Sequence, residues 1–247
     1  MTELILEALP DIEAGKPVDM SRIYLYAVRH KMERDIKAER TFTSMADKLY
    51  FMCELSWEML STDRMSINYR EFPDRIRKLF GSAVEKEKDL DHWHYDMTML
   101  IRNADGDYAP AHRSLLEFFV AYKFAAELGA LEEDFVDLIR CPQENLSTQS
   151  IDRKYRWSDY FSFTSAFQQE AKTSEISEFC PEPIEKISKT FGKSPISKAV
   201  MDLIQPLIIK GKVGEDRLLQ VIFDSKLGPE NEIRYLCGNV LKLLTDQ

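Results

Sequence analysis

The sequence predicts a mainly α-helical protein that contains one β-hairpin. Apolar residues recur at helical spacing along most of the chain, which is typical of amphipathic helices. Two short extended runs, residues 99–102 and 108–111, flank Asp105 and Gly106. An Asp-Gly pair between short strands is a strong hairpin signal. We therefore expect one hairpin in an otherwise helical fold.

The N-terminal part is expected to form two helices. Residues 2–9 form a short helix that ends at Pro10, because proline lacks the amide that a helix interior needs. Asp19 is placed to cap a longer second helix. The apolar edge of this helix comprises Met20, Tyr24, Val28, Met32 and Ile36, and its solvated face comprises Arg29, Lys31, Glu33, Arg34, Asp35 and Lys37.

The next part has the element order of a winged helix. Ser44 and Asp47 resemble a capping box at the start of a third helix, over about 44–61. An extended piece at 66–69 precedes a helix that begins near Phe72 and ends at Gly81. A further helix is expected near 85–95, and the hairpin and another helix follow it.

The helix after the hairpin is expected to be wedged between neighbours, because two of its sides are apolar. His112 lies at its N-terminal mouth. One apolar face comprises Leu115, Phe118, Phe119, Tyr122 and Ala126, and a second strip comprises Leu116, Val120 and Phe124.

From residue 132 onward, helices alternate with polar connectors, of which 141–152 is the longest. The last three helices have similar predicted lengths and short loops, which is typical of stacked helical repeats. We interpret this part as a second helical subdomain. The expected helices span 159–171, 184–191, and about 196–209, 215–225 and 230–244.

Composition narrows the class of protein. With 247 residues, 44% of them hydrophobic, the chain can bury a substantial core. Its 33 basic and 42 acidic residues give a net charge of −9, which argues against a dedicated nucleic-acid surface. There is no signal-peptide pattern, and no apolar run approaches the roughly 18 residues of a membrane span. The cysteines lack zinc-ligand spacing and indicate reduced thiols in a soluble, cytoplasmic protein: Cys53, Cys141, Cys180 and Cys237.

Few motifs could carry chemistry. Gly192-Lys193-Ser194 lacks the first glycine and the preceding strand of a phosphate-binding loop, so we interpret it as a loop between helices. No other Walker A candidate occurs, and the set of groups that P-loop phosphoryl transfer needs is absent. His92 and His94 would diverge on a helix and have no third ligand at fixed spacing, which disfavours a metal site.

Two further patterns have competing interpretations. The run 153–157, Arg-Lys-Tyr-Arg-Trp, interleaves cations with aromatic rings as single-stranded nucleic-acid surfaces do. At five residues it fits better the start of an amphipathic helix or a contact with an adjoining domain. Glu117 or Ser114 beside His112 could suggest acid–base or nucleophilic catalysis, but no orienting residue or oxyanion element can be specified. No catalytic residue is therefore assigned.

Several motifs together resemble one family. After the hairpin, Tyr108-x-x-x-His112-Arg113-Ser114 and Glu117-Phe118-Phe119-Val120-Ala121 resemble the end of the winged-helix domain of NACHT-type STAND NTPases, the bacterial relatives of NOD-like receptors. In one place the chain departs from that pattern: Pro110 stands where the family usually has an aromatic residue, so the second hairpin strand is expected to be an edge strand or distorted. Other stretches that match in the family's order are Glu7-Ala8-Leu9-Pro10, Gly15-Lys16-Pro17-Val18-Asp19, Leu55-Ser56-Trp57-Glu58-Met59, Asp89-Leu90-Asp91-x-Trp93 and Gly238-Asn239-Val240-Leu241.

The resemblance implies a domain plan and a role for His112. Residues 1–42 would end a first helical domain, 43–130 would form the winged-helix domain, and 131–247 a second helical domain. His112 would contact the phosphate of ADP and hold the inactive state. This chain would be no enzyme and would need no cofactor alone, whereas a full-length parent would bind ATP or ADP with Mg²⁺. Its partners would be an upstream nucleotide-binding core, a downstream sensor domain and further copies on activation, with no membrane.

The expected function is thus that of a regulatory segment in a signalling NTPase of prokaryotic antiphage defence. One alternative is a winged-helix DNA-binding regulator that places Arg75, Arg77 and Lys78 in the major groove, although the net negative charge disfavours it. From the residues alone, His112 would be a helix-capping or core histidine. A third alternative is a stand-alone helical interaction adaptor.

Overall fold

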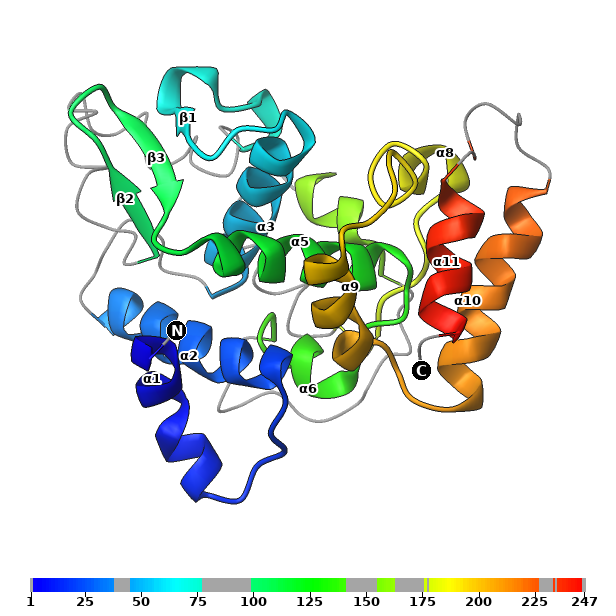
Figure 1. Cartoon of the computed structure of the whole chain (residues 1–247), viewed down its shortest axis with the longest axis horizontal. Coiled ribbons are helices and arrows are strands. Elements are labelled where there is room, and N and C mark those ends of the chain that lie inside the picture. Colours follow the sequence, from blue (N-terminus) through cyan, green and yellow to red (C-terminus); the bar gives the residue numbers. More distant parts are fainter. Residues whose placement is uncertain are drawn as a thin grey trace.

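Helices make up most of the structure, and one small antiparallel sheet lies at one end of the molecule (Figure 1), so the predicted fold class is confirmed. The computed structural model describes residues 2–37, 45–76, 99–140, 155–162, 176, 178–226, 233 and 235–245. Several expectations lie outside these residues. They concern Ser44, the helix after residue 76, the helix near 85–95, the connector 141–152 and the boundary between residues 42 and 43.

The first two helices are α1 (Thr2–Glu13) and α2 (Met20–Lys37). The prediction that α1 ends at Pro10 is wrong, because the Ala14 amide donates to the Pro10 carbonyl at 3.1 Å and carries the helix past it. Pro10 and Leu6 are both exposed, so water can reach the carbonyl that the missing proline amide leaves unpaired. The predicted cap of α2 is confirmed, since Asp19 accepts from the Arg22 amide at 2.9 Å.

The predicted solvated face of α2 is partly wrong. Lys31 and Asp35 are buried, at 8% and 1% exposure. Lys31 donates to Glu3 of α1 at 2.9 Å, and Lys48 of the next helix lies 3.4 Å from the Asp35 carboxylate. Helix α2 therefore has neighbours on both sides. Ion pairs, and not hydration, stabilise these two charged side chains.

Two helices form the centre of the molecule: α3 (Met45–Ser61) and α5 (Arg113–Glu127). They pack against each other, and α5 also contacts α9 (Lys198–Ile204) and α2. Figure 1 shows α5 crossing the middle of the fold between these elements. Both predicted apolar strips of α5 are buried, so the prediction of a wedged helix is confirmed.

The sheet joins β1 (Ile67–Asn68), β2 (Leu100–Arg102) and β3 (Asp107–Pro110) in the order β1-β3-β2. The hairpin of β2 and β3 is confirmed, and the extended piece at 66–69 supplies the third strand. The expectation of an edge strand at Pro110 is wrong, because β3 is central. Strand β1 pairs only with Tyr108 and Asp107, so at Pro110 the chain has β2 alone as a neighbour and no ladder donor is lost.

The hairpin turn depends on Asn103, which the sequence patterns did not single out. Its side-chain oxygen accepts from the amides of Asp105 and Asp107 at 3.0 and 2.9 Å. Gly106 has φ 87°, a left-handed conformation that suits glycine. Asn68 of β1 donates to the Asp105 carbonyl and the Asp107 carboxylate, at 3.0 and 2.8 Å, and ties the third strand to the turn.

The C-terminal part gives no regular repeat among the helices that the structure describes. Helix α9 packs against α5, whereas α10 and α11 pack side by side (Figure 1). The helix predicted at 159–171 is a 3₁₀ turn over its described residues, and the one predicted at 184–191 ends at Ile187. The other elements are α6 (Glu133–Val136), η1 (Tyr69–Glu71), η3 (Trp157–Ser162), α8 (Ile184–Ile187), η4 (Gln205–Leu207), α10 (Lys212–Ser225) and α11 (Leu236–Thr245).

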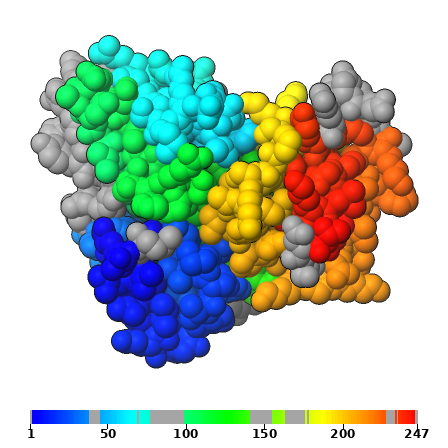
Figure 2. All heavy atoms as spheres, in the orientation of Figure 1, coloured from blue at the N-terminus to red at the C-terminus, as the bar shows by residue number. Residues whose placement is uncertain are grey.

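One core runs through the described parts of the chain. The predicted boundary between residues 130 and 131 follows a turn at Gly129, where φ is 65°. The Ile209 amide donates to the Ala130 carbonyl at 2.8 Å, so the C-terminal part is hydrogen-bonded to the residue that follows α5 and this turn. Figure 2 shows the central and C-terminal segments meeting as one continuous surface on this face.

Candidate functional site at the start of α5

His112 is the N-cap residue of α5. Its backbone is extended, with φ −149° and ψ 139°, and helical geometry begins at Arg113. The Ser114 amide donates to the imidazole Nδ1 at 3.2 Å, which satisfies one of the amides that every helix start leaves unpaired. The ring itself is exposed. His112 is therefore both a cap and a solvent-facing side chain.

Ser114 connects His112 to the helix behind it. The Ser114 hydroxyl lies 2.5 Å from Nδ1, and the same side chain forms a hydrogen bond with the Tyr24 phenol of α2. Burial raises the pKa of Tyr24, and the Ser114 contact opposes that rise. Tyr24 stacks on Phe118, with ring centroids 5.3 Å apart. Ser114, two residues after His112, therefore links the first turn of α5 to α2.

This arrangement suits an anion better than catalysis. A helix start carries a partial positive charge, which favours negative ligands; the Ser114 and Leu115 amides here are already paired with the Nδ1 and the carbonyl of His112. Glu117 does not contact the histidine, because its Oε1 accepts from Arg113 at 3.1 Å. Within the part of the chain that the structure describes, no carboxylate orients the His112–Ser114 pair as catalytic triads require.

The other sequence candidates lie in structural roles. Gly192-Lys193-Ser194 forms the predicted loop between α8 and α9, where Lys193 donates to the Ser61 carbonyl at 3.1 Å. Tyr155 and Trp157 are buried, so their rings cannot stack on nucleic-acid bases. His92 and His94 lie outside the described residues, among which no group of three or more potential metal ligands occurs.

A buried charge network was missed by the sequence patterns. Lys123 of α5 donates to Glu54 of α3 at 2.5 Å and lies 2.8 Å from Glu127, and all three side chains are at most 5% exposed. Trp157 donates to Glu54 at 2.7 Å, and Thr190 donates to Glu127 at 2.6 Å. The signal that could have revealed it is a lysine and a glutamate four residues apart inside an otherwise apolar helix.

The ionisation of this network follows from its burial and its pairing. Burial alone would lower the pKa of Lys123, but the Glu127 and Glu54 carboxylates together raise it well above its ordinary value. Burial would likewise raise the pKa of Glu54, but Lys123 and Arg75 outweigh it and lower that pKa. For Glu127 burial wins, and its pKa is raised. Lys123 is therefore charged at neutral pH and holds α3 and α5 together.

Arg75 also belongs to this network. Its guanidinium donates to Glu54 at 2.7 Å and to Glu58 at 3.2 Å. The predicted alternative of Arg75 in a DNA major groove would require breaking both pairs. Arg77 and Lys78 lie outside the described residues.

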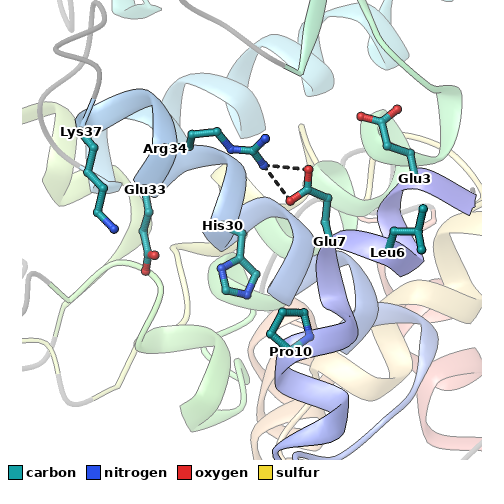
Figure 3. A pocket seen from close by; sticks show the side chains of 8 residues that line it. All are labelled: Glu3, Leu6, Glu7, Pro10, His30, Glu33, Arg34 and Lys37. Atoms are coloured by element: carbon teal, nitrogen blue, oxygen red, sulfur yellow. Dashed lines mark hydrogen bonds and ion pairs between the residues drawn. The ribbon is translucent and has the colours of Figure 1, made fainter.

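A cavity of about 560 Å³ lies between α1 and α2 (Figure 3). Its lining is charged, and several of these charged groups have partners on the two helices. Arg34 donates to both carboxylate oxygens of Glu7 at 2.7 Å, and His30 lies 2.6 Å from Asp11. Figure 3 shows the Arg34–Glu7 pair spanning the two helices. These contacts fasten α1 to α2, so we assign no ligand to this cavity.

Comparison with known proteins gives one close match. Over 249 aligned positions the chain is 60% identical to an uncharacterised WD repeat-containing protein of Nostoc sp. (strain PCC 7120). The match covers 99% of this chain but only 16% of the relative. No family model matches the chain, and no solved structure matches it. Among the described residues, no helix combines the length and the apolar character that a membrane crossing needs.

Proposed function

We propose that the chain is the regulatory part of a NACHT-type STAND NTPase of prokaryotic defence. It clamps ADP in the closed, inactive state and relays a signal from a sensor domain to a nucleotide-binding core. The chain itself performs no chemistry. ATP or ADP and Mg²⁺ bind in the core, which precedes this segment in a cytoplasmic parent protein that oligomerises on activation.

The position of His112 carries this proposal. An exposed imidazole caps a 15-residue helix directly after a hairpin. A neutral imidazole provides an N–H donor for a phosphate, and the partial positive charge of a helix N-terminus favours the anion. The strand order β1-β3-β2 around the start of a helix at residues 74–76 supports the winged-helix expectation.

The relative supports a multidomain parent. This chain matches only 16% of it, and its printed name says that it contains WD repeats. The family resemblance independently implies a repeat domain that acts as a sensor. We therefore propose that a repeat domain in the parent of this chain supplies the signal. The DNA-binding alternative is disfavoured by the ion pairs of Arg75 and by the net charge of −9.

Substituting His112 in a protein that carries both this chain and its nucleotide-binding core tests the proposal. Leucine removes a charge-assisted hydrogen bond worth about 1.5–3 kcal/mol from the closed state alone, which shifts the equilibrium by roughly 10- to 100-fold. We expect His112→Leu to lose ADP faster and to signal without its trigger. The measurements are the ADP retained by purified protein and the basal effector output.

His112→Asn is the matched control. Asparagine is a good N-cap residue, so it keeps the capping hydrogen bond but is too short to replace Nε2. If His112 binds phosphate, Asn and Leu should both release ADP. If His112 is only a cap, Asn should behave as wild type while Leu lowers the melting temperature and the activity. That second pattern would refute the proposal.

A further inference from the structure

The contacts around His112 fix which ring nitrogen carries the proton. A backbone N–H can only donate, and the Ser114 amide points at Nδ1 from 3.2 Å. Nδ1 is therefore the acceptor, so in the neutral ring the proton resides on Nε2. The Ser114 hydroxyl, 2.5 Å from the same nitrogen, must then donate as well.

The hydroxyl of Ser114 also contacts a side chain of α2. It is in hydrogen-bonding contact with the Tyr24 phenol of α2. Tyr24 is 1% exposed and stacks on Phe118, so a buried and packed ring lies behind Ser114.

We propose that Ser114 is a positioning residue that holds His112 with Nδ1 as acceptor and Nε2–H as the outward donor. The nature of the ligand rests on the proposed function, whereas the orientation of the ring does not. An anionic oxygen needs a donor at Nε2. In the other tautomer the Nε2 lone pair would face the anion and repel it.

The test is a tautomer measurement on the ¹⁵N-labelled 247-residue chain, by long-range ¹H–¹⁵N correlation at a pH above the ordinary titration range of imidazole. His112→Leu identifies the His112 signals among those of the four histidines. We expect the wild type to show Nε2–H. Ser114→Ala should lower the ratio of Nε2–H to Nδ1–H by about 2- to 10-fold, the equivalent of one net hydrogen bond.

Two variants separate positioning from general stability. Ser114→Thr keeps the hydroxyl and should restore the wild-type ratio. Tyr122→Phe is the control, because it removes another buried phenol contact, to the Phe135 carbonyl at 2.6 Å, and should leave His112 unchanged.

An unchanged ratio in Ser114→Ala, a wild-type ring with Nδ1–H, or an equal shift in Tyr122→Phe would overturn the positioning role. ADP retention by Ser114→Ala in a protein with the nucleotide-binding core is a separate measurement. A shifted tautomer with unchanged ADP retention would refute the phosphate contact of the proposed function and leave the positioning role intact.

Discussion

Replacing Lys123 by methionine should destabilise the chain strongly. Methionine fills a similar volume but leaves the Glu54 and Glu127 carboxylates, at 3% and 5% exposure, without their shared ammonium group. Removing one partner of a buried ion pair costs about 3–5 kcal/mol, because the remaining charge has neither water nor a counter-ion. Glu127 is left in that position, whereas Glu54 keeps Arg75 at 2.7 Å, so we expect a cost within that range in urea unfolding at neutral pH.

Lys31→Met is the matched control for this experiment. Lys31 is also buried, but its partner Glu3 is 78% exposed on its side chain and stays hydrated when the lysine is lost. We expect a clearly smaller cost for that variant than for Lys123→Met. A second variant combines Lys123→Met with Glu127→Gln, which removes the carboxylate left without a counter-ion and should recover much of the loss.

The pH dependence of the Lys123→Met variant gives a further check. Burial is the largest influence on Glu54 and on Glu127, and it favours the neutral acid. Without Lys123 the folded-state pKa of Glu127 should rise further above the ordinary 4.5, so its contribution to stability is present below that pH and is lost as pH rises through the folded value. The deficit against wild type should therefore shrink in acid. Equal costs for Lys123→Met and Lys31→Met, or no recovery in the variant that adds Glu127→Gln, would refute this account of the network.

Two further predictions concern single positions. Gly129→Ala should cost about 2–5 kcal/mol in urea unfolding, since a Cβ at φ 65° would lie 2.4 Å from the Pro181 nitrogen. The control is Gly15→Ala, at φ 80° with no atom within 4 Å, which should cost only about 1 kcal/mol. Equal costs for the two variants would contradict the steric explanation. Burial raises the pKa of Tyr50 and of Tyr122 well above 10.0, so their stabilising contribution is intact below that pH and is lost as pH rises beyond it. The urea midpoint of Tyr122→Phe should fall less than that of wild type between about pH 9 and pH 11, and an equal fall in both proteins would contradict this explanation.

Local signals predicted the elements that local interactions determine. The Asp-Gly pair placed the hairpin, the apolar strips placed α5, and Asp19 placed the start of α2, because each depends on residues within a few positions. The errors arose where a distant partner decides the outcome. Lys31 was predicted to be solvated because its pairing with Glu3 of α1 could not be foreseen. Strand β3 was predicted to be an edge strand because its pairing with β1 could not be foreseen.

Only part of the candidate site could be predicted from the sequence, for the same reason. His112 was placed at the mouth of its helix from periodicity, and its role came from the family resemblance. The contact with Tyr24 could not be predicted, because it depends on how α2 packs against α5. The Glu54–Lys123 pair joins residues 69 positions apart, and no spacing rule connects them.

Helix α5 carries both the residues around His112 and the buried ion pairs of Lys123. His112 and Ser114 lie in its first turn, whereas Lys123 and Glu127 lie near its other end, in a helix of 15 residues and about 22 Å. The two sets of variants should therefore act by separate routes. Ser114→Ala changes the ring of His112 through contacts of a few ångström, and it leaves the buried charges in place. Lys123→Met releases α5 from α3 at the far end, while the Ser114–His112 contact stays within one helical turn. If the closed state needs α5 held at both ends, each variant should speed ADP release in the parent protein, but only Ser114→Ala should alter the tautomer.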